Sequence, residues 1–209
     1  VIQSTCVVGG VRRNIDSEMT KKVESGLHQC KQMLDTTILP VILKDPTIKR
    51  RTVGKGVLSG EQANLLGAVG PTLRGSGVAL DIRMTGYAAY KEIGFEPVAE
   101  TAGDSYARTL VRVRETYQSM ELVLKALSMM PEGEIQIRVD GWPQGEAISR
   151  VEQPRGELIY YAKGNGTNNL ERLKIRTPTF ANIPVLLAML PGCELADVPV
   201  ITLSIDPCI

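Results

Sequence analysis

The sequence has little of what many catalytic sites are built from. It contains one histidine, His28, and four cysteines without C-x-x-C spacing, which excludes most zinc sites and disfavours a Ser-His-Asp triad. Aromatic residues make up 4% of the chain, too few for a base-stacking platform. No apolar run approaches the roughly 20 residues of a membrane span.

The composition is that of a globular protein. Of 209 residues, 43% are hydrophobic and 22% charged, and the net charge of +1 gives no reason to expect nucleic acid or an anionic membrane as a partner. We expect residues 1–209 to form a single domain with reduced thiols, as in the cytosol. The chain opens in mid-pattern at Val1, which indicates a fragment of a longer subunit.

Helical periodicity dominates the first two thirds of the chain. Apolar residues at steps of three and four predict a helix that is capped by Asn14 or Asp16 and runs towards Leu39, where Pro40 ends or kinks it. Residues 45–57 indicate a solvated connection, and Ser59 with Gln62 fits a capping box that opens a short helix, stopped at Gly70-Pro71. The longest pattern, residues 103–130, predicts one wall of an antiparallel bundle.

The last third is mixed. Residues 135–139 indicate a short strand, 140–150 a loop, and 157–163 with 170–176 a β-hairpin. A second buried helix is expected at 180–190, and the apolar run 198–205 indicates a buried terminal strand. The predicted fold class is therefore α+β, predominantly α-helical, a long antiparallel helix bundle with a small β-hairpin region.

The glycine-rich stretch 70–90 lacks both phosphate-binding fingerprints, the G-x-G-x-x-G pattern and the Walker lysine. Its glycines are typical of tight backbone approaches. Because Arg74, Asp81 and Arg83 are interleaved with them, we expect these three to form a buried charge network between helices.

Three prolines stand beside groups suited to a site, near Arg155, Thr179 and Cys208. Proline fixes the direction of its neighbours, so these turns offer a planar cation, a hydroxyl and a soft sulfur that suits a transition metal. Ordinary loop turns, and an inert terminal thiol at Cys208, are the alternative interpretation.

Motifs in the same order resemble two related families. Residues 152–158 resemble the E-x-P-R-G-E-L element, and 176–182 the R-x-P-[ST]-F-x-N element, of nickel-iron hydrogenase large subunits and the quinone-site core subunit of respiratory complex I. Residues 9–13, 70–83 and 103–115 resemble further elements of that superfamily. Asp206-Pro207-Cys208 is similar to the hydrogenase D-P-C-x-x-C motif, which favours the C-terminal portion of an energy-converting, membrane-bound hydrogenase, such as the carbon-monoxide-induced type.

The resemblance implies roles for five residues. Cys208 would be a nickel ligand, Arg155 and Asp206 catalytic residues at the nickel-iron centre, and Pro178 and Thr179 would bind a cyanide on iron. It also implies CO and cyanide ligands, dihydrogen and protons as substrates, an iron-sulfur small subunit and membrane subunits as partners, and a cytoplasmic, peripheral position on the inner face of the membrane.

Two departures limit the resemblance. The upstream R-x-C-G-x-C motif is not present, and the second cysteine of D-P-C-x-x-C would fall two residues past Ile209. One of four expected thiolates is therefore here, and we expect that the fragment does not hold the centre alone. A complex-I-type quinone oxidoreductase subunit without a metal site is the alternative function, and an assembly module that keeps the fold without chemistry is a third.

Overall fold

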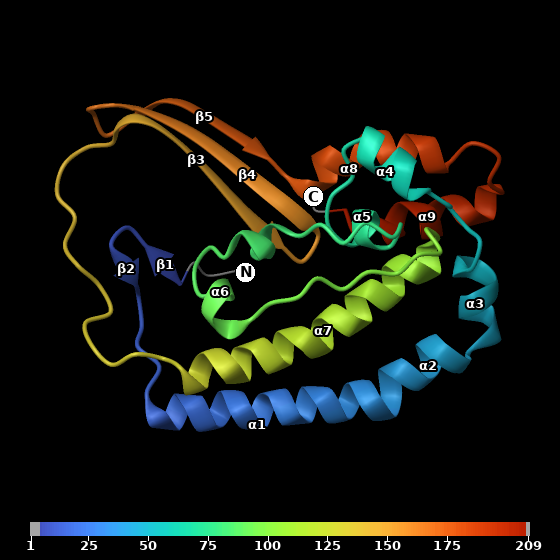
Figure 1. Ribbon diagram of the computed structural model, residues 1–209, viewed down its shortest axis with the longest axis horizontal. Helices are drawn as coiled ribbons and strands as arrows, with labels where there is room; N and C mark the ends of the chain where they lie inside the picture. The colour runs from blue at the N-terminus through green and yellow to red at the C-terminus, as the bar shows by residue number, and fades with distance from the viewer. Residues whose placement is uncertain (1–4, 208–209) are drawn as a thin grey trace.

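Helices make up most of the regular structure, and the strands form two antiparallel sheets (Figure 1). The computed structural model describes residues 5–207. The helical segments are α1 (Ser17–Met33), η1 (Leu34–Ile38), α2 (Leu39–Lys44), α3 (Pro46–Thr52), α4 (Gly60–Leu65), α5 (Pro71–Arg74), η2 (Ile82–Thr85), α6 (Tyr90–Ile93), α7 (Ser105–Ser128), α8 (Pro178–Met189), η3 (Leu195–Asp197) and α9 (Val198–Ser204). The strands are β1 (Cys6–Val7), β2 (Gly10–Val11), β3 (Gln144–Gln153), β4 (Gly156–Asn165) and β5 (Leu170–Arg176).

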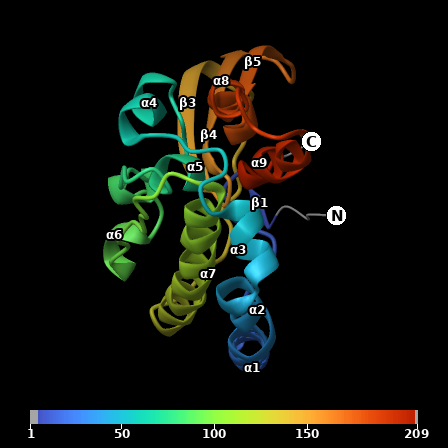
Figure 2. The ribbon, with the colours of Figure 1, turned by 90° about the vertical axis from the view of Figure 1, so that its right-hand side faces the viewer.

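The two longest helices, α1 and α7, lie side by side and run in opposite directions (Figures 1 and 2). Each begins at an aspartate whose side chain accepts a hydrogen bond from the third helical amide, Asp16 for α1 and Asp104 for α7. The predicted long helix is thus confirmed. The long antiparallel bundle is not confirmed, because the helices around this pair are short.

The predicted break at Pro40 takes an unexpected form. The π-helical segment η1 precedes the proline, and the chain then continues as α2 to Lys44. A π-helical turn is one way to fit an interruption into a helix without ending it. After it, residues 46–52 form α3, capped by Asp45, where a solvated connection was expected. The Ser59–Gln62 capping box is present as predicted.

The larger sheet has the order β3-β4-β5. The predicted hairpin is confirmed as β4 and β5, with Tyr160 opposite Ile175. The predicted loop at 140–150 is wrong in its second half, because β3 begins at Gln144 and pairs with β4 as far as Gln153 opposite Gly156. The predicted strand at 135–139 is reduced to a single bridge, between Gln136 and Gly10 of β2.

The terminal apolar segment is a helix, α9, and the prediction of a strand there is wrong. Ile201 and Ile205, one helical turn apart, enter the core and are 0% and 1% exposed. This packing outweighs the strand preference of β-branched residues. The core cluster that receives them lies among α4, α5, α8 and α9. Its buried members are Leu58, Ala63, Ala68, Leu73, Val185, Met189, Ile201 and Ile205.

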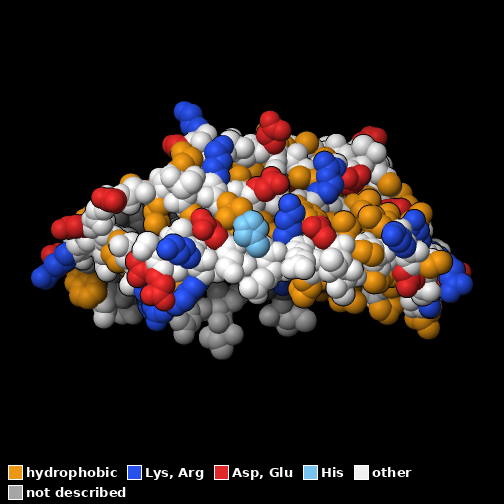
Figure 3. All heavy atoms as spheres, turned by 90° about the horizontal axis from the view of Figure 1, so that it is seen from below, with side chains coloured by type: hydrophobic (Ala, Val, Ile, Leu, Met, Phe, Trp, Pro, Cys, Tyr) orange, Lys and Arg blue, Asp and Glu red, His pale blue; other side chains and the backbone are white. Residues whose placement is uncertain are grey.

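The lower face of the molecule is formed largely by α1, and Figure 3 shows charged side chains of both signs along it, with the histidine among them. His28 is exposed there. Among the described residues, no helix is both long and apolar enough to cross a membrane.

Candidate functional site

The three proline-marked segments come together around α8, which contacts both β4 and α9 (Figure 1). Arg155 lies in the tight turn between β3 and β4. Pro178 is the first residue of α8, and Thr179 follows it, half-buried. Asp206 follows the end of α9. Segments distant in sequence are thus neighbours, whereas Cys208 lies outside the described residues.

Arg155 and Asp206 form an ion pair, with 3.4 Å between Nε and Oδ1. The other carboxylate oxygen of Asp206 lies 4.0 Å from Nε of Arg112, on α7. Asp206 has a φ of 54°, a left-handed conformation that costs a non-glycine residue about 1–2 kcal/mol. A carboxylate is therefore held between two guanidinium groups on a strained backbone, as is common at functional sites.

Two arginines of α7 fix the end of α9. Nε of Arg108 donates to the hydroxyl of Ser204 at 2.9 Å, and Nη2 of Arg112 donates to the Ser204 carbonyl at 2.9 Å. Arg108 is completely buried, and burial lowers its pKa to about 10, so it stays a cation at neutral pH. These bonds hold the backbone two residues before Asp206.

The segment before α5 is in close contact with the backbone of the Arg155 turn. Gly70 has a φ of 66°, and a Cβ at this position would lie 2.3 Å from the Arg155 carbonyl oxygen and 2.5 Å from Cα of Gly156. The preceding residue, Val69, exchanges two hydrogen bonds with the side chain of Asn182 on α8, at 3.0 and 3.2 Å. One segment therefore touches the Arg155 turn and is tied to α8.

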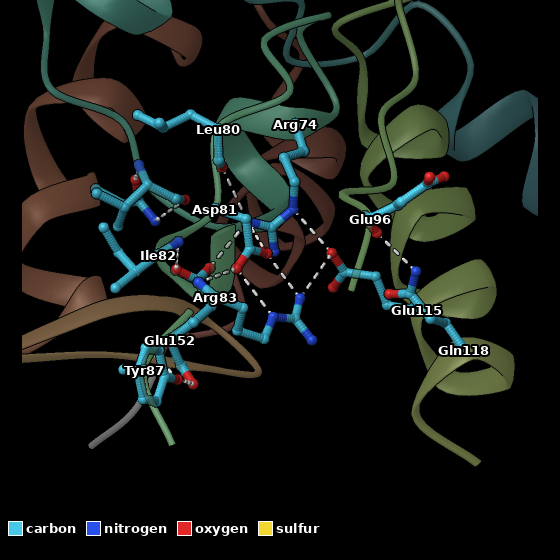
Figure 4. A network of polar contacts seen from close by, with 12 residues as sticks. Arg74, Leu80, Asp81, Ile82, Arg83, Tyr87, Glu96, Glu115, Gln118 and Glu152 are labelled. Atoms are coloured by element: carbon cyan, nitrogen blue, oxygen red, sulfur yellow. Dashed lines mark hydrogen bonds and ion pairs between the residues drawn. The ribbon is translucent and has the colours of Figure 1, made fainter. Parts of the chain in front are cut away.

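A buried charge network lies at the other end of α5, around Arg74, and Figure 4 shows its side chains converging from four elements. Nη1 of Arg74 is 2.9 Å from Asp81 and 2.9 Å from Glu152, and its Nε is 2.8 Å from Glu115. Asp81 also pairs with Arg83 at 2.7 Å. The predicted network of Arg74, Asp81 and Arg83 is thus confirmed, and it extends to α7 and β3.

The sequence did not show which residues make contacts between segments that are distant in the chain. Asn182 and Glu152 belong to recognised motifs, but nothing in their spacing shows that they bind Val69 and Arg74. Nothing in the spacing of Ser204 shows that its hydroxyl accepts a hydrogen bond from Arg108. Within residues 5–207, no group of three or more His, Cys, Asp or Glu side chains could hold a metal ion.

The family model described as "Respiratory-chain NADH dehydrogenase, 49 Kd subunit" matches residues 1–141 and 136–209. The carbon monoxide-induced hydrogenase of Rhodospirillum rubrum is 40% identical over 97% of this chain and 56% of its own length. The membrane-bound hydrogenase subunit alpha of Pyrococcus furiosus is 36% identical over 99% of this chain and 52% of its own. An NADH-quinone oxidoreductase subunit of Herpetosiphon aurantiacus is 36% identical over 96% of this chain and 56% of its own.

A solved structure of the membrane-bound sulfane sulfur reductase, an archaeal respiratory membrane complex, includes a chain with a TM-score of 0.88 and 33% identity. The match covers 96% of this chain and 57% of that one. The chain thus spans about half the length of the relatives it matches. Two of them, the Pyrococcus furiosus hydrogenase subunit and the sulfane sulfur reductase chain, belong to membrane-bound proteins. The resemblance predicted from the motifs is confirmed: the chain belongs to the family of the respiratory-chain NADH dehydrogenase 49 kDa subunit, to which energy-converting hydrogenase large subunits are similar.

Proposed function

We propose that this chain is part of the catalytic large subunit of an energy-converting nickel-iron hydrogenase, which carries out reversible dihydrogen oxidation and proton reduction. The observation that carries the proposal is the pairing of Arg155 with Asp206 at the start of the Asp206-Pro207-Cys208 motif. The similarity to two hydrogenases over nearly the whole chain supports it.

The donor groups of the described residues fit the surroundings of such a centre. Nε of Arg155 is buried and faces Asp206 at 3.4 Å, and the planar guanidinium carries further N–H donors that could bind an anionic ligand such as cyanide. The Thr179 side chain would supply a hydroxyl at the first turn of α8, and Pro178 would fix its direction. Cys208 would supply a soft thiolate, and the other metal ligands would come from outside this chain.

When bound, the nickel-iron centre would supply the heterolytic cleavage of dihydrogen. Arg155 would place positive charge and N–H donors over the anionic ligands. Asp206 would orient Arg155 through their ion pair. Arg112 would keep the carboxylate in place from the opposite side.

The partners follow from the same proposal. An iron-sulfur small subunit would exchange electrons with the centre, and membrane subunits would hold the complex on the cytoplasmic face of the cell membrane. This position agrees with the membrane-bound complexes of two relatives.

A complex-I-type quinone oxidoreductase subunit without a metal site is the second candidate. The 36% identity to the NADH-quinone oxidoreductase subunit of Herpetosiphon aurantiacus favours it. In that case Arg155 and Asp206 would be a structural ion pair, and the thiol of Cys208 would have no ligand role.

The Arg155→Lys variant of the full-length protein, assembled in its complex, tests the proposal. Lysine keeps the charge but loses the planar fork, so we expect hydrogen evolution to fall by about 10- to 100-fold while the nickel content stays unchanged. The surface variant Arg138→Lys, whose ion pair with Asp140 is exposed, is the control and should keep full activity. Full activity in Arg155→Lys would contradict the assigned role.

A further inference from the structure

The strand that delivers Arg155 to the site enters the buried charge network three residues earlier. One carboxylate oxygen of Glu152 accepts a hydrogen bond from Nη1 of Arg74 at 2.9 Å, and the other accepts from the Ile82 amide at 3.3 Å. The side chains of Glu152 and Arg74 are 3% and 1% exposed. An ion pair this deeply buried is geometrically fixed, because any displacement would leave its charges unpaired in a low-dielectric interior.

The main chain of Glu152 is held as well. Its amide donates to the hydroxyl of Tyr87 at 3.0 Å, and on the far side of the turn Gly156 is in close contact with Gly70. Arg74 and Gly70 are the last residue and the N-cap of the same short helix, α5. This helix therefore holds both ends of the five-residue segment 152–156, which contains Arg155.

The network connects the segment that holds Arg155 with the helix α7, which faces Asp206. Glu115, which pairs with Arg74, lies one helical turn after Arg112 on α7, and Arg112 faces Asp206. The cluster contains three carboxylates and two arginines, and burial raises the pKa of Glu152. Because Arg74 contacts all three carboxylates, it is the residue on which the arrangement depends.

We propose that Arg74 is a positioning residue for Arg155, and that it acts through Glu152. The inference rests on the proposed function, because it gives Arg155 its place over the centre. In this arrangement the ion pair between Arg74 and Glu152 fixes the end of β3. Because the turn that follows is tight, the position of Arg155 is fixed as well, and its guanidinium lies at a defined distance from Asp206.

A double-mutant cycle tests the inference in the full-length protein within its complex. Glu152→Gln keeps the shape of the side chain but removes its charge, and we expect hydrogen evolution to fall about tenfold with unchanged nickel content. In the Arg155→Lys background the same change should have no further effect, since the guanidinium it positions is gone. Equal effects in both backgrounds would show a general structural role and overturn the inference.

Hydrogen exchange supplies a readout that does not depend on activity. Glu152→Gln and the milder Arg74→Lys should each speed amide exchange in the peptide 153–157 by about tenfold, a local opening rather than global unfolding. Glu100→Gln, which breaks a partly exposed ion pair between Glu100 and Arg114 of α7, is the control and should leave that peptide unchanged. Unchanged exchange in both network variants would overturn the inference. A parent protein without nickel would overturn only the proposed function.

Discussion

Replacing Gly70 by alanine should displace the Arg155 turn by a distance that the structure fixes. The new Cβ would lie 2.3 Å from the Arg155 carbonyl oxygen and 2.5 Å from Cα of Gly156. Both neighbours are backbone atoms, so no side-chain rotation relieves the contact. Real Cβ atoms essentially never approach closer than 3.0 Å, and the turn must therefore retreat by about 0.7 Å.

The cost has two parts. Gly70 has φ 66° and ψ −149°, a conformation nearly confined to glycine, and holding alanine there costs about 1–3 kcal/mol. With the steric contact added, we expect a loss of stability of about 3 kcal/mol. A misplacement near 1 Å can cost about 100-fold in rate, so hydrogen evolution should fall by about 10- to 100-fold.

The assay is thermal unfolding and hydrogen evolution of the full-length complex, with Gly67→Ala as the control. Gly67 also has a positive φ, 69°, but no atom lies within 4 Å of the position its Cβ would take. Its replacement should cost about 1 kcal/mol and leave activity unchanged. Equal losses of stability and activity in the two variants would refute the reasoning, because the contact with the turn would then have no effect.

Three other changes have defined outcomes. Arg108→Met should destabilise the protein by about 3 kcal/mol in urea titration, because two buried carbonyls and two serine hydroxyls lose their donor, and a loss below about 1 kcal/mol would contradict this. Asn182→Leu should cost about 2–4 kcal/mol by the same titration, since both bonds to Val69 disappear, and wild-type stability would refute it. A hydrogen bond from Lys55 holds the pKa of Asp197 below its ordinary 3.8, so its stabilising effect should be present above that pH and lost as the pH falls through the lowered value. Asp197→Asn should flatten the acid limb of a stability–pH curve in that window, and an unchanged slope would exclude the role.

Local signals in the sequence were sufficient for several elements. The length of α7 follows from an apolar stripe at helical spacing, and its start from an aspartate in the N-cap position. The Ser59–Gln62 capping box is likewise a short-range pattern. The network of Arg74, Asp81 and Arg83 was predictable because its members lie within ten residues of one another.

Elements decided by tertiary packing were not predictable. Residues 198–204 carry valine, isoleucine and threonine, which favour a strand, yet two buried isoleucines one turn apart hold them in α9. The first part of β3 follows Trp142-Pro143 directly, begins with Gln144-Gly145 and is mostly exposed, so no buried face marks it in the sequence. Its pairing with β4 over ten residues determines it instead.

In the candidate site, too, the individual motifs were predictable from the sequence and the contacts between them were not. The motifs that contain Arg155, Pro178, Thr179 and Asp206 were recognisable one by one, and their roles at a metal centre stay predictions. That Arg155 meets Asp206 depends on the separate placement of a β-turn and the end of α9. The contacts that fix both, from α5 and α7, join residues roughly 80–100 positions apart.

The nickel content of the purified full-length protein tests the central claim most directly. Elemental analysis of the wild-type complex should find nickel in stoichiometric amount with the large subunit, and the Cys208→Ser variant should lose it, because a hydroxyl replaces the soft thiolate. A wild-type protein without nickel, or a Cys208→Ser variant that binds nickel as well as the wild type, would contradict the proposed nickel-iron site.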